Sequence, residues 1–177
     1  MYIVFIAKSM DGFIAGKNDE IDWLDLIPNP SQSDMGYYDF IENVDAILMG
    51  RRSFEVVNGF DVDWPYKIPV YIWSNSLKAI PKKYSGKAEL IKGNIDEVMK
   101  ELKEQGHNRI YIDGGRTIHS FLERDLIDEM TTTTIPVLLG GGIPLFSERT
   151  GRLEFELIKS KVYLDQIVQN HYRRKRR

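Results

Sequence analysis

The sequence predicts an α/β fold with a mostly parallel central sheet, helices on its faces and an antiparallel C-terminal hairpin. Three observations predict it. Short runs of β-branched and aromatic residues alternate with helical patterns, as in sheets covered on both faces. Glycines follow several of these runs, where the backbone turns into the next segment. Two strand-like segments near the end, 153–163 and 166–173, flank a short turn.

The first half of the chain supplies strands and helices in alternation. Continuous apolar runs predict strands at residues 2–8, 13–15, 46–49 and 69–73. Apolar residues on one face predict a helix over 34–43, with Ser33 as its N-cap. A second, shorter helix is expected over 51–58, directly after Gly50.

The second half repeats this alternation. A short strand is expected at 89–91, and Asn94 with Glu97 forms a capping pair for a helix that ends before Gly106. The remaining expected elements are a strand at 109–113, a helix at 117–123 entered through Gly114-Gly115, and a threonine-rich strand at 130–139.

Composition bounds the class of protein. A chain of 177 residues with 42% hydrophobic residues suits one domain over 1–177 with its own core. Because cysteine is absent, disulfides, thiolate metal sites and cysteine nucleophiles are excluded, and with 3 histidines we expect no metal site. No apolar run reaches the roughly 20 residues that span a bilayer, so we expect a cytoplasmic protein without membrane contact.

Charge is distributed unevenly. The formal net charge is −2, and the last five residues, 173–177, carry five positive charges, which leaves −7 on the rest. An acidic body argues against broad nucleic-acid binding. The basic tail is expected to be solubilising and partly disordered, and a nucleic-acid-binding role for it is the less favoured alternative.

Three turns carry residues suited to phosphate. Gly50-Arg51-Arg52-Ser53 opens a helix after a buried strand, which offers free N–H groups and cations; an ordinary helix start with solvated arginines is an equal alternative. Ser74-Asn75 follows another strand and by itself suits a polar turn. Gly114-Gly115-Arg116-Thr117 joins a strand to a helix, and its position favours function. The triplet 140–142 is read as a structural connection because no helix follows it.

The longest resemblance lies in the second half. Ile110 to Gly115, Leu126 to Glu129, Pro136 to Gly140 and Pro144 to Phe146 resemble the reductase domain of bifunctional riboflavin-biosynthesis deaminase–reductases. Residues 9–15, Ser-Met-Asp-Gly-Phe-Ile-Ala, resemble the opening loop of that family. The resemblance implies a three-layer fold of the dihydrofolate reductase type.

Other segments resemble dihydrofolate reductase itself. The resemblance implies an NADPH site made of Ala7, Ile14, Gly50, Arg51, Arg52, Ser53, Ser74, Asn75, Gly114, Gly115, Arg116 and Thr117. It also implies a cis peptide between the paired glycines, and it places Asp34 at the substrate carboxylate as the expected catalytic residue. The chain departs from the bifunctional enzymes in lacking a deaminase domain, and Asp113 stands where dihydrofolate reductases usually have a further glycine.

These observations predict an NADPH-dependent reductase that transfers hydride to a small heterocyclic or ribosyl-pyrimidine substrate. The riboflavin precursor 5-amino-6-(5-phosphoribosylamino)uracil is the substrate that the family label implies, and a dihydrofolate or other pterin is the alternative. A non-catalytic nucleotide-binding protein of the same fold is a third reading. The resemblance also implies a homodimer, because the C-terminal hairpin offers a sheet edge.

Overall fold

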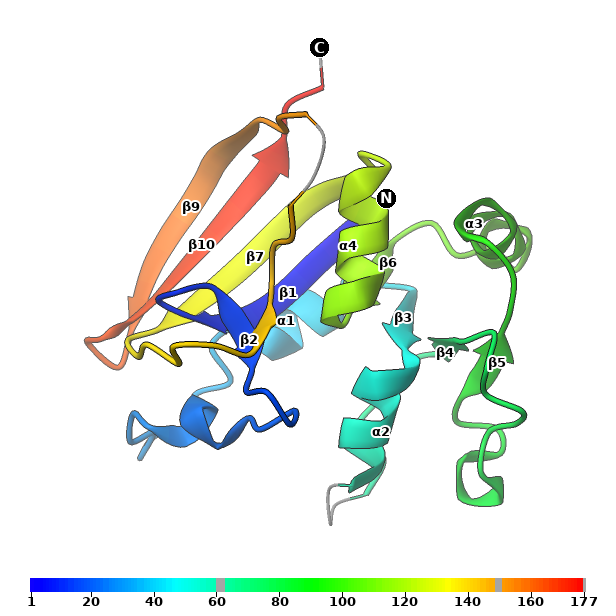
Figure 1. Cartoon of the computed structure of the whole chain (residues 1–177), viewed down its shortest axis with the longest axis horizontal. Helices are drawn as coiled ribbons and strands as arrows, with labels where there is room; N and C mark the ends of the chain where they lie inside the picture. Colours follow the sequence, from blue (N-terminus) through cyan, green and yellow to red (C-terminus); the bar gives the residue numbers. More distant parts are fainter. Residues whose placement is uncertain (60–62, 149–150, 177) are drawn as a thin grey trace.

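An eight-stranded sheet forms the centre of the computed structural model, which describes residues 1–59, 63–148 and 151–176 (Figure 1). The strand order is β5-β4-β3-β6-β1-β7-β10-β9. The strands are β1 (Tyr2–Ser9), β3 (Ala46–Gly50), β4 (Val70–Trp73), β5 (Glu89–Ile91), β6 (Ile110–Asp113), β7 (Ile127–Ile135), β9 (Phe155–Tyr163) and β10 (Ile167–Arg174). The six strands from β5 to β7 are parallel, and β10 and β9 continue the sheet antiparallel. The predicted α/β class and hairpin are confirmed.

Helices cover both faces of this sheet. Helices α3 (Ile95–Glu104) and α4 (Gly115–Glu123) pack on one face, where Val98 and Phe121 are fully buried. Helices α1 (Tyr37–Ile41) and α2 (Arg51–Gly59) pack on the other, where Phe54 and Phe40 meet the sheet. The alternating apolar positions of the strands feed both cores, so three layers result.

A small second sheet holds the first loop against the body. Strand β2 (Phe13–Ala15) pairs antiparallel with β8 (Ile143–Pro144). Gly142 precedes β8, and a Cβ built on it would lie 2.1 Å from the Ala15 carbonyl oxygen. The Asp11 carboxylate accepts hydrogen bonds from the Leu139 and Gly140 N–H groups at 3.2 and 2.8 Å. Residues 140–142 therefore form a structural connection in this fold.

Two predicted elements were wrong at their ends. The helix expected over 34–43 spans only Tyr37–Ile41, because Met35 (φ 52°) and Gly36 (φ 83°) are left-handed and turn the chain first. Ser33 is not its N-cap. The strand expected over 130–139 runs from Ile127 to Ile135; it ends before Pro136, which has no N–H for the ladder.

The capping box predicted for α3 is confirmed. The Asn94 side chain accepts from the Asp96 and Glu97 N–H groups at 2.9 and 3.1 Å, and the Glu97 carboxylate accepts from the Asn94 N–H at 2.8 Å. Two orphan N–H groups of the first turn are thus satisfied. The short 3-10 helices η1 (Asp22–Asp25) and η2 (Lys82–Tyr84) were not predicted.

The basic tail is more ordered than predicted. Arg173 and Arg174 are the last residues of β10. Arg174 donates to the Asp125 carboxylate at 2.6 and 2.9 Å, and the Arg176 guanidinium contacts the Asp128 carboxylate. Acidic residues just before and at the start of β7 therefore hold Arg174 and Arg176 by ion pairing. In the described part of the chain, no helix is long and apolar enough to cross a membrane.

Candidate active site

A cleft of about 670 Å³ opens where parallel strands end. Ala7 near the end of β1, Gly50 at the end of β3, Trp73 at the end of β4 and Asp113 at the end of β6 all line it. In open parallel sheets, this carboxyl edge is where ligands bind. The loop that contains Asp19 lines the cleft as well, as does helix α2.

The turn from β3 into α2 brings cations to the cleft. Gly50 lies so close to α4 that a Cβ would be 2.9 Å from the Thr117 hydroxyl oxygen. Arg51 donates to the Glu55 carboxylate at 2.6 Å and to the Ser76 hydroxyl at 3.4 Å. Ser76 in turn lies 3.3 Å from the Ser74 hydroxyl. A guanidinium and two hydroxyls thus share one corner of the cleft.

The turn from β6 into α4 depends on paired glycines. Gly114 has φ 90°, and a Cβ on it would lie 2.2 Å from the Ser53 hydroxyl oxygen. A Cβ built on the next residue, Gly115, would lie 2.9 Å from Cδ1 of Ile14, which is too close for ordinary packing. The cis peptide expected here was wrong: the described residues contain none, since the positive φ of Gly114 makes the turn. Only glycine combines this conformation with this packing.

These two turns suit a polyphosphate anion. Helices α2 and α4 each begin at the cleft, and neither has an acidic residue in its first turn. Their free N–H groups and dipoles attract negative charge. Arg51, Arg52 and Arg116 add guanidinium groups, which bind phosphate through paired hydrogen bonds. The residues present therefore fit the phosphates of a dinucleotide.

Asp113 is a functional candidate that the sequence analysis did not select. Its carboxylate accepts a hydrogen bond from the Tyr111 hydroxyl at 3.3 Å. That hydroxyl also donates to the Phe5 carbonyl at 2.8 Å. Burial raises the pKa of the Asp113 carboxyl to about 6, against the lowering effect of its hydrogen bonds with Tyr111 and Gly114. A carboxyl that titrates near neutral pH can donate or accept a proton. Its position between a buried strand and a glycine turn was the available signal.

Three tyrosines, one buried and two half-buried, lie near this carboxyl. Burial, followed by the negative charge of Asp113, raises the pKa of the Tyr37 hydroxyl to about 12 and also raises the pKa of Tyr66. The pKa of Tyr111 rises for the same two reasons. These hydroxyls remain protonated near neutral pH, so they act as hydrogen-bond donors and do not ionise.

Ten of the twelve residues predicted for the cofactor line this one cleft: Ala7, Ile14, Gly50, Arg51, Arg52, Ser53, Ser74, Gly114, Gly115 and Arg116. Asn75 and Thr117 do not line it. The Asn75 side-chain amide donates to the Gly93 carbonyl and accepts from the Gly93 N–H. Thr117 is a buried residue of α4 that faces Gly50. Residues from four separate segments thus meet as the sequence analysis expected, and their ligand stays a prediction.

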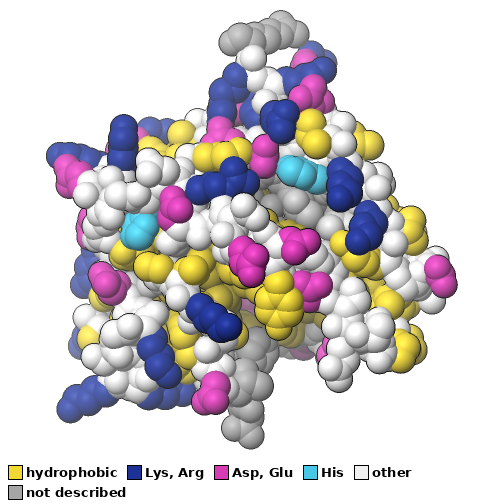
Figure 2. Space-filling view, turned by 180° about the vertical axis from the view of Figure 1, so that it is seen from behind, with side chains coloured by type: hydrophobic (Ala, Val, Ile, Leu, Met, Phe, Trp, Pro, Cys, Tyr) yellow, Lys and Arg dark blue, Asp and Glu magenta, His cyan; other side chains and the backbone are white. Residues whose placement is uncertain are grey.

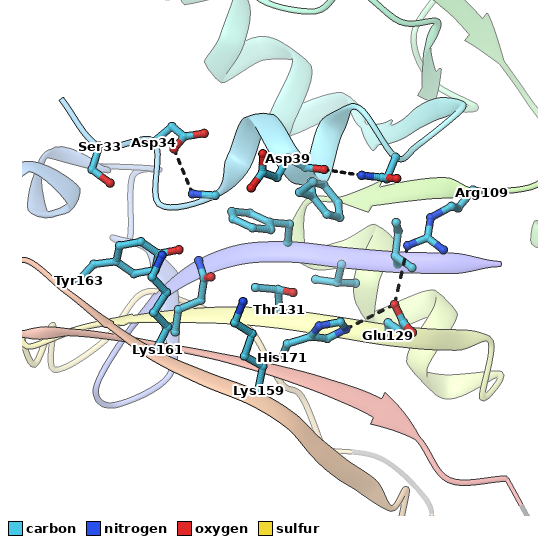
Figure 3. A pocket seen from close by; sticks show the side chains of 17 residues that line it. Ser33, Asp34, Asp39, Arg109, Glu129, Thr131, Lys159, Lys161, Tyr163 and His171 are labelled. Atoms are coloured by element: carbon cyan, nitrogen blue, oxygen red, sulfur yellow. Dashed lines mark hydrogen bonds and ion pairs between the residues drawn. The ribbon is translucent and has the colours of Figure 1, made fainter.

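Asp34 lies elsewhere. Its carboxylate accepts from the Tyr38 and Gly36 N–H groups at 2.7 and 3.1 Å, and the Tyr38 hydrogen bond is the main reason that its pKa is lowered. It lines a groove of about 440 Å³ between α1 and the sheet, with Lys161 and Tyr163 opposite (Figure 3). Figure 2 views this face and shows acidic side chains on one side of a hollow, with basic side chains and a histidine on the other.

The groove is separate from the cleft, since the two share no lining residue. At its far end the Glu129 carboxylate lies 3.4 Å from the His171 ring and 3.8 Å from the Arg109 guanidinium (Figure 3). The Arg173 guanidinium lies 3.3 Å from the same carboxylate. The structure therefore shows Asp34 as a cap for the first turn of α1. Asp34 does not line the cleft, and its expected catalytic role stays a prediction.

Comparison with known sequences identifies the family. Residues 1–169 match the family described as the RibD C-terminal domain. The chain belongs to this family. The RibD C-terminal domain is a reductase domain of riboflavin biosynthesis, so the reductase resemblance of the second half is confirmed at the level of the family.

Solved structures agree. A protein of Shewanella sp. PV-4 named for riboflavin biosynthesis is 48% identical and superposes with a TM-score of 0.96, covering 99% of both chains. The deaminase/5-amino-6-(5-phosphoribosylamino)uracil reductase of Thermotoga maritima is 13% identical with a TM-score of 0.77, over 99% of this RibD-type chain and 56% of that enzyme. The dihydrofolate reductase of Enterococcus faecalis, complexed with NADP(H), has a TM-score of 0.67 at 12% identity, over 99% and 97% of the two chains. The dihydrofolate reductase-like fold is confirmed.

Proposed function

We propose that this RibD-type chain is an NADPH-dependent reductase of a small heterocyclic or ribosyl-pyrimidine substrate. The observation that carries the proposal is the convergence of two glycine turns, two helix N-termini and three arginines on one cleft. Family membership supports a reductase, and the fold is shared with a reductase that was crystallised with NADP(H).

In this proposal the two turns bind different phosphates of NADPH. Arg51, Arg52, Ser53 and Ser74 surround the corner suited to the 2′-phosphate, which favours NADPH over NADH. The turn at Gly114-Gly115-Arg116 receives the pyrophosphate at the start of α4. Ala7 and Ile14 orient the nicotinamide, which supplies the hydride when the cofactor is bound.

Reduction of a C=N or C=C bond needs a proton as well as a hydride. The hydride adds to one atom of the double bond, and the other atom takes the proton, so that both bonds to hydrogen are accounted for. Asp113 lines the cleft, and burial raises the pKa of its carboxyl to about 6. We assign it the proton donation, either directly or through one water. The Tyr111 hydroxyl fixes the orientation of its carboxyl.

Titration with NADPH and NADH tests the cofactor. We expect NADPH to bind in the micromolar range and NADH more weakly, since the second cofactor lacks the 2′-phosphate. Arg51→Ala is expected to weaken NADPH binding by about tenfold, or roughly 1.4 kcal/mol, and NADH binding by much less. Arg152→Ala is the matched control, because Arg152 pairs with Glu154 on the surface and does not line the cleft. Failure of both nucleotides to bind at millimolar concentration would contradict the proposal.

A further inference from the structure

The charges that line the cleft are unevenly placed. Its cations are Arg51, Arg52 and Arg116 among the described residues, and all three lie at the first turn of α2 or α4. Its carboxylates are Asp19, Glu55 and Asp113. The positive and negative charges of the lining therefore balance only when no anion is bound at the turns.

The rest of the lining is apolar. Ile21 and Leu24 come from the first loop, and Val56 and Val57 from the middle of α2. Two of the arginines also have carboxylate partners: Arg51 lies 2.6 Å from Glu55, and Arg52 lies 3.9 Å from Asp19.

Three other cationic side chains do not line this cleft. The Lys8 ammonium bonds to the Ser9 carbonyl at 3.4 Å and does not line the cleft. Lys159 and Lys161 line the groove beside α1, which shares no residue with the cleft. Among the described residues that line the cleft, a phosphate on a second ligand would therefore meet no guanidinium or ammonium group beyond those assigned to the cofactor phosphates.

We infer that the substrate of this cleft is an unphosphorylated, neutral or cationic nitrogen heterocycle whose N–H groups face the Asp113 carboxyl. The inference rests on the proposed function, because bound NADPH supplies the deciding charge. Its 2′-phosphate brings about 1.5 to 2 negative charges near pH 7, and its pyrophosphate brings more. A phosphorylated substrate would then enter an apolar pocket that already holds an excess of negative charge and the carboxyl of Asp113, where like charges repel strongly.

Phosphate binding tests this inference without knowledge of the substrate. Inorganic phosphate and ribose 5-phosphate are titrated against the full chain, alone and saturated with NADP⁺, with chemical shifts of backbone amides as the readout. We expect the free protein to bind both anions at the turns. Saturation with NADP⁺ is expected to weaken this binding by at least about tenfold and to leave no shift at residues 21–24 or 56–57.

A variant supplies the positive control. Val56→Lys places an ammonium group in the apolar part of the cleft, and it is expected to restore phosphate binding to the NADP⁺-saturated protein. Leu138→Lys adds the same charge at an exposed position that does not line the cleft and is expected to restore nothing. Circular dichroism of both variants checks that they fold as the parent does.

A matched pair of ligands gives the second readout. 5-Amino-6-ribosylaminouracil and its 5′-phosphate differ only in the phosphate, and both are titrated against the NADPH complex. Equal or tighter binding of the unphosphorylated compound agrees with the inference, as does failure of both compounds to bind when phosphate also fails. The inference is overturned if phosphate still binds near residues 21–24 or 56–57 with NADP⁺ present, or if the 5′-phosphate compound binds tenfold more tightly. Failure of NADP⁺ to bind at all would overturn the proposed function instead.

Discussion

Asp113 couples the chemistry of the cleft to the stability of the fold. Its pKa in the folded chain, about 6, lies above the usual value of 3.8, so the folded state holds the proton more tightly than the unfolded state does. The resulting stabilisation is complete at low pH and is lost as the pH rises through about 6. Asp113→Asn removes this loss and is expected to raise the free energy of unfolding at pH 7 by about 2 to 3 kcal/mol relative to the parent.

Denaturant unfolding at several pH values measures this change. Asp34→Asn is the control, and its effect on stability has the opposite pH dependence. Backbone N–H groups lower the pKa of the Asp34 carboxyl, so the stability that this carboxylate contributes is lost as the pH falls. If Asp113 is the proton donor, Asp113→Asn also removes the decline of kcat/KM with rising pH that centres near 6. An unchanged pH profile in an active Asp113→Asn enzyme would contradict the donor role.

A comparison of Gly114 with Gly106 separates the energetic cost of backbone strain from that of a steric clash. Gly114 and Gly106 have nearly the same positive φ, 90° and 89°, but a Cβ on Gly106 meets nothing within 4 Å while one on Gly114 lies 2.2 Å from the Ser53 hydroxyl oxygen. Gly106→Ala therefore costs only the strain, about 1 kcal/mol. Gly114→Ala is expected to cost about 2 to 4 kcal/mol and to weaken NADPH binding. Thermal unfolding and cofactor titration of the two variants measure the difference, and equal losses would show that packing at Ser53 is unimportant.

The sequence was informative about residues that share a turn and less so about side chains that meet across the fold. Gly50 and Gly114 were selected because a glycine directly after a strand indicates a sharp turn or a close approach of the backbone to another group. Asp113 was passed over because its raised pKa depends on burial beside Tyr111 and on surrounding tyrosines that come from distant segments. Asp34 was selected through the resemblance to dihydrofolate reductase, which could not show that its carboxylate accepts hydrogen bonds from the Gly36 and Tyr38 N–H groups.

At the scale of elements, the central strands β3, β4 and β6 were predicted well because their apolar runs are continuous and nearly all of their residues are buried. The boundaries that failed depend on single residues. Pro136 ends β7 four residues before the expected end, and the left-handed pair Met35-Gly36 delays α1. A left-handed methionine has no sequence signature. Pro136, in contrast, is a sequence signal for the end of a strand, because proline has no N–H to donate to a neighbouring strand.

The pairing of β10 with the start of β7 makes a prediction at this scale. The Arg174 side chain is 9% exposed and contacts the Asp125 carboxylate at 2.6 Å, while the Arg152 side chain is 79% exposed and lies 2.7 Å from Glu154. Arg174→Gln is expected to lower the free energy of unfolding by about 1 to 3 kcal/mol, because it leaves part of a shielded ion pair unmatched. Arg152→Gln is expected to change it by about 0.5 kcal/mol or less. Urea unfolding compares the two, and equal effects would show that shielding adds nothing at Arg174.

The central sheet of the molecule has an exposed edge at strand β9. Among the described residues, no strand pairs with the outer side of β9. Its Leu157, Ile158 and Val162 side chains are 57%, 42% and 59% exposed. We propose that a second copy of the chain covers this edge, since uncovered apolar edge strands favour association. Sedimentation is expected to show a homodimer that Val162→Lys converts to a monomer and Leu138→Lys does not. A monomer at all concentrations would contradict this proposal.

Trp73 gives the cleft an optical reporter of its own. Its indole N–H donates to the Gly93 carbonyl at 3.0 Å, and its side chain lies in the wall where β4 ends. Trp23 is buried in another cluster, and Trp64 packs with Tyr66 and Tyr84. Because indole emission overlaps the absorption of a reduced nicotinamide, excitation of Trp73 should pass to a dinucleotide in the cleft as energy transfer. Occupancy can then be followed in the unlabelled protein, and Trp73→Phe should remove most of the signal while Trp64→Phe leaves it.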